Sequence, residues 1–190
     1  MNDTSKWYDK PRDWGSIRNF NLDHLLLKKK TFEADPARFT QYSTDENWLM
    51  GHAIPPFQRP IVWDEDRMIA FIETLVQKGD PGTYTYHVND HMEKTASGRE
   101  IYPRDTWLLD GQQRITSLDR FFEDEFPVYG LFWSQVDETR QRGFLFSTTF
   151  AAYEVRNKSE LELRELYDLK NFSGVPHQEH ERAVQPGMRL

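Results

Sequence analysis

A run of polar residues near the middle of the chain has the residue types needed to bind phosphate. In the segment LLDGQQRIT, the apolar part ends at Asp110, Gly111 allows a tight turn, and a helix is expected to begin at Gln112. The free N–H groups at the start of a helix form an anion site, and Arg114 in the first turn can clamp a phosphate. Gln112 and Gln113 can hold a base edge, a ribose or a water, and Asp110 can take a metal ion, a water or a nucleotide hydroxyl. The alternative is that Asp110 only caps the helix and Arg114 forms a surface ion pair.

A proline-rich segment upstream carries a second pair of candidate phosphate ligands. Residues 54–63 read IPPFQRPIVW, and three prolines restrict the backbone around Gln58 and Arg59. A rigid loop holds polar side chains in place at little entropic cost, and the Arg59 guanidinium could grip phosphate. The alternative is an ordinary proline-rich lead into a helix, with Arg59 in a salt bridge. Trp63 could stack on a base, but beside two aliphatic residues we expect it to lie in the core.

Other polar clusters are expected to be structural or solvated. His87 and His91 form a pair without the context that would complete a metal site, and His177 and His180 lie in a polar segment with proline and glycine. The lysines at 28–30 stand at the end of a predicted short helix, where cations usually form a solvated cap. We therefore expect metal binding at neither histidine pair and no DNA contact at the lysines.

Apolar periodicity predicts the elements that position these segments. Helical spacing recurs in four segments, and β-branched, aromatic or otherwise apolar runs occur in five. The predicted helices are 21–30, 67–77, 112–122 and 159–169, and the predicted strands are 48–54, 83–88, 106–109, 127–133 and 143–147. This order does not follow a regular βαβ repeat and predicts a mixed α/β or α+β domain.

Composition limits the class of protein. The chain has 190 residues, no cysteine, 14% aromatic residues and a formal net charge of −7. The length suits one domain, and the lack of cysteine excludes disulfides, thiolate metal sites and a cysteine nucleophile. A net-acidic chain is not a generic DNA-coating protein, because phosphate contacts dominate non-specific affinity. No apolar stretch approaches the ~20 residues of a membrane span and no secretory signal opens the chain, so we expect a cytoplasmic protein without a membrane partner.

Charge and composition divide the chain into three parts. Residues 1–30 carry seven basic and four acidic residues, so their net charge of +3 leaves −10 for the rest of the chain. We interpret them as an N-terminal extension followed by a short helix. Residues 31–169 hold most of the predicted elements and form the expected nucleotide-binding domain. Residues 170–190 are polar and contain proline and glycine, which favours a mobile C-terminal tail.

The two polar segments together resemble one family. The pattern I-P-x-x-Q-R-x-x-x-W, a helix, a strand and then D-G-Q-Q-R-x-T resembles the N-terminal domain of GmrSD-type modification-dependent restriction enzymes. The corresponding domain of the SspE antiphage proteins is also similar, and the family resembles the ParB/sulfiredoxin fold. The match runs from about residue 48 to 122 and continues more weakly to about 169. The resemblance therefore implies a compact α+β domain with a small mixed sheet flanked by helices.

The resemblance also implies a function. It implies binding and hydrolysis of a nucleoside triphosphate with Mg²⁺, linked to DNA restriction or nicking in phage–host defence or counter-defence. The implied catalytic residues are Asp110, Gln113 and Arg114, and Asp110 is also the implied metal ligand. The implied nucleotide and phosphate ligands are Gln58, Arg59, Gly111, Gln112 and Arg114. The implied partners are the nucleotide, DNA and a separate nuclease subunit.

One departure leaves three functions open. In GmrSD-type enzymes the nuclease is a further C-terminal region of the HNH type, and 190 residues leave no room for it. The first hypothesis is a Mg²⁺-dependent NTPase, with or without DNA-nicking activity of its own. The second is a binding module that holds a nucleotide or modified DNA without turnover and acts through a partner nuclease. The third is an acidic anti-restriction decoy that mimics DNA, suggested by the charge of −10 beyond residue 30. We expect the first.

Overall fold

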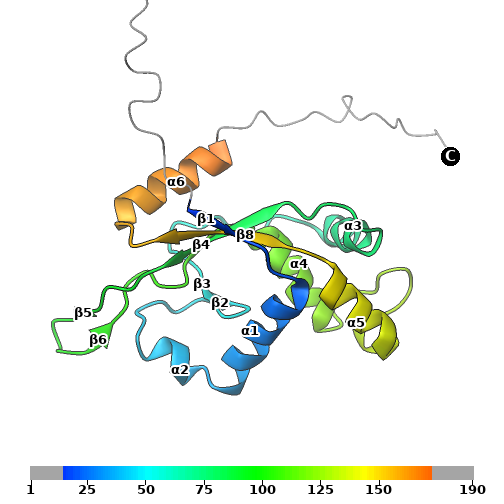
Figure 1. Cartoon of the computed structure of the whole chain (residues 1–190), viewed down its shortest axis with the longest axis horizontal. Coiled ribbons are helices and arrows are strands. Elements are labelled where there is room, and N and C mark those ends of the chain that lie inside the picture. The colour runs from blue at the N-terminus through cyan, green and yellow to red at the C-terminus, as the bar shows by residue number, and fades with distance from the viewer. Residues whose placement is uncertain (1–14, 173–190) are drawn as a thin grey trace, which may run out of the picture.

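A four-stranded mixed sheet forms the centre of the computed structural model, which describes residues 15–172 (Figure 1). The strands follow the order β1 (Ser16–Arg18), β8 (Ala151–Arg156), β4 (Thr83–Val88) and β7 (Leu108–Asp110). The central pair β4–β8 is parallel, and both outer pairs, β1–β8 and β4–β7, are antiparallel. The chain is thus an α+β domain, as the sequence predicts.

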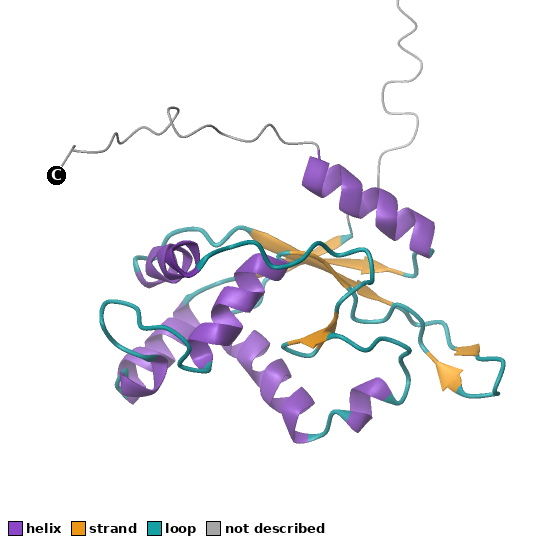
Figure 2. Cartoon of the chain, turned by 180° about the vertical axis from the view of Figure 1, so that it is seen from behind, coloured by secondary structure: helices purple, strands orange, loops and turns teal. Residues whose placement is uncertain are grey.

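Helices cover both faces of this sheet. Figures 1 and 2 show α6 on one face and α1, α4 and α5 on the other. The helices are α1 (Leu22–Ala34), α2 (Ala37–Thr40), α3 (Glu65–Val76), α4 (Gln112–Phe122), α5 (Glu138–Ser147) and α6 (Glu160–Phe172), with a short 3₁₀ helix at Trp133–Gln135. Two small hairpins complete the fold: β2 (Trp48–Leu49) with β3 (His52–Ala53), and β5 (Glu93–Lys94) with β6 (Glu100–Ile101).

Alternation along the strands divides the interior into two cores. Leu108 packs in a large cluster of seventeen buried residues on the α1, α3, α4 and α5 side. The next residue, Leu109, packs in a cluster of six with Leu163 and Leu166 of α6. Successive side chains of a strand point to opposite faces, so this short strand serves both cores and brings Asp110 to the edge between them.

The regions with strong periodicity match their predicted elements closely. The structure confirms the predicted helices at α3, α4 and α6 and the strand at β4 within a few residues. The helix α6 begins with a capping box: the Ser159 N–H donates to the Glu162 carboxylate at 2.9 Å, and the Ser159 hydroxyl accepts the N–H of Glu162 at 3.4 Å. The predicted strand at 48–54 is instead a hairpin, because Met50 and Gly51 both adopt positive φ, 48° and 76°, and turn the chain.

Two predicted strands after α4 are wrong. The segment 143–147 belongs to α5, which begins after Asp137, whose carboxylate accepts the N–H of Arg140. The segment 127–133 forms a tight turn closed by a bridge between Val128 and Leu131, followed by the 3₁₀ helix. The strand that does occur here, β8, was not predicted.

The lysines at the end of the first helix are not the expected solvated cap. The helix continues beyond them to Ala34, so they lie within it rather than at its end. Lys29 is buried and pairs with Glu33, with Asp119 at 2.9 Å and with Glu123 at 3.0 Å. Three carboxylates around one ammonium offset the cost of its burial.

The ends of the described region bear on the predicted division of the chain. Within the N-terminal extension, residues 16–18 form the edge strand β1 of the main sheet. The predicted tail begins at residue 170 inside α6, and residues 1–14 and 173–190 lie outside the described part. The three-part division therefore stays a prediction. Within residues 15–172, no helix is both long and apolar enough to span a membrane.

Candidate functional site

The two polar segments meet at one cleft. It encloses about 200 Å³ between the proline-rich loop and the β7–α4 junction. All the predicted catalytic and phosphate-binding residues line it: Gln58, Arg59, Asp110, Gly111, Gln112, Gln113 and Arg114. Trp63, Arg67, Leu109 and Asn171 complete the lining.

Glycine is required at the turn that opens α4. Gly111 has φ +94°, and a Cβ there would lie 2.6 Å from the Cβ of Tyr84 on β4. The residue that caps α4 therefore has no side chain, and no side-chain hydrogen bond caps the helix. The neighbouring α3 is different, because its N-cap Asp64 accepts the N–H of Arg67. The first turn of α4 thus presents uncapped amides in a segment that lines the cleft.

Asp110 and Arg114 occupy the same turn. Asp110 Oδ1 accepts the N–H of Gly111 at 2.7 Å, and Oδ2 lies 3.5 Å from Nη2 of Arg114. Arg114 Nη1 donates to the carbonyl of Pro81 at 2.9 Å, which orients the guanidinium. A Cβ at Gly82 would lie 2.6 Å from that Nη1, so the absence of a side chain there makes room for Arg114. Arg114 is therefore held at one nitrogen and only loosely paired at the other.

Two of the three predicted glutamines, Gln113 and Gln58, hold the loop in place. The buried Oε1 of Gln113 accepts the N–H groups of Val62 at 2.9 Å and Trp63 at 3.1 Å, and its Nε2 donates to the carbonyl of Pro60 at 3.2 Å. Gln58 Nε2 donates to the carbonyl of Leu108 at 2.8 Å. These bonds fix the loop against β7 and α4, which is a positioning role; a catalytic role for Gln113 stays a prediction.

Arg59 is the most available cation of the cleft. Its side chain is exposed and forms no hydrogen bond or ion pair with any residue between 15 and 172. Trp63 is half-buried and packs edge-on against Phe71, with ring centroids 5.8 Å apart. It therefore packs against the core, as predicted, yet it also lines the cleft, and the Arg67 guanidinium lies 4.7 Å above its ring.

Helix α6 supplies residues that the sequence did not reveal. Asn171 lines the cleft, and Lys170 Nζ lies 3.9 Å from Oδ2 of Asp110. Burial lowers the pKa of Lys170, and the neighbouring Asp110 carboxylate opposes that effect. Nothing local marked these two residues, because they reach the cleft only through the packing of α6 on the sheet.

The cleft offers few ligands for a resident metal ion. Within residues 15–172, no cluster of three or more histidine, aspartate or glutamate side chains could hold one. Asp110 is the single carboxylate of the lining, and Oε1 of Gln112 is buried without a hydrogen-bond partner among the described residues. One or two oxygen ligands fit Mg²⁺ that arrives with phosphates and keeps several waters, rather than an all-protein site.

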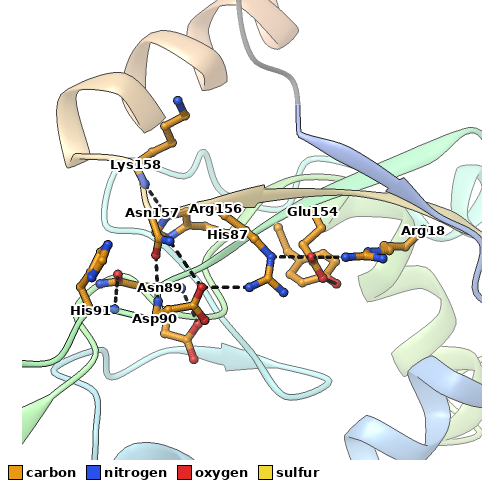
Figure 3. Close-up of polar contacts among 11 residues, drawn as sticks. Arg18, His87, Asn89, Asp90, His91, Glu154, Arg156, Asn157 and Lys158 are labelled. Atoms are coloured by element: carbon orange, nitrogen blue, oxygen red, sulfur yellow. Dashed lines mark hydrogen bonds and ion pairs between the residues drawn. The ribbon is translucent and has the colours of Figure 1, made fainter.

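Of the first predicted histidine pair, His87 lies on the inner strand β4 and serves the fold, while His91 is exposed. His87 is fully buried, with Nδ1 2.8 Å from the carbonyl of Arg104 and Nε2 accepting the N–H of Lys158 at 3.0 Å. Both ring nitrogens are therefore used, and burial lowers the His87 pKa. Figure 3 shows this imidazole beside a chain of ion pairs that links Glu154, Arg156 and Asp90. The second predicted pair, His177 and His180, lies outside the described residues.

Comparison with known proteins identifies the family. The family model described as "GmrSD restriction endonuclease, N-terminal domain" matches residues 39–185. No curated protein and no solved structure matches the chain. Because the match covers most of the sequence, the chain belongs to this family, which links it to restriction and phage defence.

Proposed function

We propose that this chain binds a nucleoside triphosphate with its phosphates in the cleft and hydrolyses it during DNA restriction. One observation carries the proposal: the uncapped start of α4 lines a cleft with three arginines and a single carboxylate. Phosphoryl transfer depends on positioning and charge neutralisation more than on covalent chemistry, and this lining suits that need. Family membership supports the link to restriction.

The size of the cleft suggests which part of a nucleotide it holds. Its volume of about 200 Å³ is below the ~300–1,000 Å³ of most small-molecule pockets, so it suits a polyphosphate rather than a whole nucleotide. The base would then lie at the mouth, beside Trp63 and Arg67. In this arrangement Arg59 and Nη2 of Arg114 contact phosphate oxygens, and the first-turn amides of α4 hold a further oxygen.

Asp110 has two proposed tasks. With Oε1 of Gln112 it would hold Mg²⁺, which neutralises charge on the phosphates when bound. Its carboxylate would also orient the attacking water, while Gln58 and Gln113 keep the loop in register. Only one carboxylate lines the cleft, and it already accepts a hydrogen bond from Gly111. That observation keeps binding without turnover as a second candidate function.

Arg59 offers the cleanest test, because its exposed side chain forms no hydrogen bond or ion pair with a residue between 15 and 172. Phosphate release from ATP, GTP, CTP and UTP with Mg²⁺ would be measured for wild type, Arg59→Ala and Arg142→Ala, an exposed arginine on α5. We expect a loss of ~10- to 100-fold for Arg59→Ala, from the 1.5–3 kcal/mol of a charge-assisted hydrogen bond, and none for Arg142→Ala. Normal turnover by Arg59→Ala would refute this site.

The same samples separate the other functions. Nucleotide binding without phosphate release would favour the binding module. Plasmid DNA in parallel tubes tests whether the chain nicks DNA itself or needs the proposed partner nuclease subunit. Salt-sensitive inhibition of a restriction enzyme, with no response to nucleotide, would favour the acidic decoy.

A further inference from the structure

Helix α6 contacts both segments of the cleft. The Tyr167 hydroxyl accepts the backbone N–H of Arg59 at 3.4 Å, and Lys170 Nζ lies 3.9 Å from Oδ2 of Asp110. Asn171 forms part of the cleft lining, and its Nδ2 donates to the carbonyl of Tyr167 at 2.9 Å. The loop that carries Arg59 and the turn that carries Asp110 are therefore held by the same two turns of one helix.

The buried apolar interface between α6 and the rest of the domain is small. Leu163 and Leu166 bury their side chains in the cluster of six residues, while the main core contains seventeen. Beyond that cluster, α6 also contacts Phe57 of the proline-rich loop. The Tyr167 ring packs edge-on against the Phe57 ring, with centroids 5.3 Å apart, and the Arg164 guanidinium lies 4.4 Å from the centroid of the Phe57 ring. An element held by few buried contacts opens at lower free energy than the core.

Lys170 is placed to orient Asp110 from the side of the sheet. Its ammonium lies 5.1 Å above the Tyr153 ring on β8 as well as beside the Asp110 carboxylate. Arg114 contacts the same carboxylate oxygen at 3.5 Å. The Asp110 carboxylate thus lies between a cation of the cleft and a cation of α6, so the position of α6 affects its orientation.

We propose that Lys170 is a positioning residue for Asp110 and that α6 is the element that responds to nucleotide occupancy. This inference rests on the proposed function, because it takes Arg59 and Asp110 as nucleotide contacts. A nucleotide that fixes these two residues stabilises the surface on which α6 sits. By linkage, loosening α6 weakens nucleotide binding by the same factor.

Hydrogen exchange of the wild-type chain tests this coupling without any substitution. The β,γ-imido analogues of ATP and GTP would be added with Mg²⁺, and amide exchange compared between α6 and α5, which supplies no residue to the cleft lining. We expect exchange in α6 to slow by ~5-fold or more, the fold-change at the lower end of common allosteric couplings, with no change in α5.

Variants of Lys170 test the positioning role. Lys170→Met should weaken binding of the same analogue by ~5-fold or more, whereas Lys170→Arg, which keeps the charge, should restore most of it. Lys30→Met, an exposed lysine on α1, is the matched control. Tyr167→Phe keeps the ring against Phe57 and removes only the hydroxyl, so it tests the link to Arg59 even if the lysine variant fails to fold.

The outcomes separate the two proposals. If wild type binds the analogue, yet α6 exchange is unchanged and Lys170→Met binds normally, the coupling is wrong and the proposed function stands. If wild type binds none of the analogues and releases no phosphate, the proposed function fails and this inference fails with it. Equal loss of affinity in Lys170→Arg and Lys170→Met would show that a positive charge at this position does not support nucleotide binding and would overturn the positioning role.

Discussion

Replacing Lys28 with methionine should change how the stability of the domain depends on pH. The Lys28 ammonium lies 3.0 Å from Nδ1 of His52 and 5.6 Å above the Tyr86 ring. Its stem packs against the β2–β3 turn, where a Cβ at Gly51 would lie 2.9 Å from Cγ of Lys28. Burial lowers the pKa of Lys28 from 10.5 to about 7, and Asp105 only partly opposes it.

The sign follows from proton binding in the two states. Between pH 7 and 10.5 the unfolded chain holds a proton on Lys28 that the folded chain has released, so folding stability rises with pH through this window. At ~1.4 kcal/mol per pKa unit the full effect would approach 5 kcal/mol. Because the side chain is only half-buried, solvent screening reduces it. We expect a gain of ~2 kcal/mol between pH 7 and 9.5.

Urea unfolding of wild type and Lys28→Met at several pH values from 6.5 to 9.5 measures this effect. The Lys28 charge also lowers the pKa of His24 and of His52. Above pH 7 both histidines are neutral, so in that range the difference between the two unfolding free energies isolates Lys28. The variant also removes a partner of His52, but that cost is independent of pH because burial keeps His52 neutral. Lys30→Met should track wild type. If the unfolding free energies of wild type and Lys28→Met change equally with pH, the pKa of Lys28 is not lowered in the folded protein.

Three further substitutions test the site and its supports. Gly111→Ala should lower the free energy of unfolding in urea by at least ~2 kcal/mol, because φ is +94° and the added Cβ would meet Tyr84. Its control, Gly143→Ala within α5, adds a Cβ in open space and should be neutral or stabilising. Gln113→Ala should lower the free energy of unfolding by ~2–3 kcal/mol, because it leaves the N–H groups of the loop unpaired. Gln113→Glu keeps the acceptor oxygen and should lower it by less. Equal losses in the two variants would contradict the positioning role. His87→Gln should make the domain less sensitive to acid, since the lowered His87 pKa removes stability as pH falls below 6.5; an unchanged difference in unfolding free energy between pH 7 and 5 would contradict this.

The sequence predicted best where one physical signal dominated. A glycine turn and an apolar stripe predicted the helix α4. Helical spacing likewise predicted α6, which begins with the capping box at Ser159. The prediction failed at α5, because the aromatic run after Gly143 resembles a strand when read alone. The carboxylate of Asp137, which caps this helix, was the signal that could have corrected it.

Non-local pairing explains the strand that was missed. On β8, Glu154 points into the interior, where a charged residue argues against a buried strand. Its carboxylate is satisfied by Arg18 at 2.8 Å and by the Tyr86 hydroxyl at 2.8 Å, two partners far away in the sequence. These bonds, together with Arg156, hold the Glu154 pKa down to about 2 despite burial. Only the folded structure shows that this position can be interior and charged.

In the candidate site, too, local sequence predicted some residues, and others depend on contacts between distant segments. The residues from Asp110 to Arg114 and the pair Gln58 and Arg59 could be singled out from their types and spacing, and the structure places both groups on one cleft. The separate task of Gln113 could not be foreseen, because its partners are backbone groups some fifty residues away. The contribution of α6 likewise depends on how that helix seats against the sheet.

Nucleotide turnover by the Arg59→Ala variant tests the central claim most directly. We expect wild type to release phosphate from at least one nucleoside triphosphate with Mg²⁺. We expect Arg59→Ala to lose ~10-fold or more of this rate with an unchanged melting temperature, and Arg142→Ala to retain it. If wild type neither binds nor hydrolyses any nucleotide, or if Arg59→Ala is as active as wild type, this cleft is not the site of nucleotide hydrolysis.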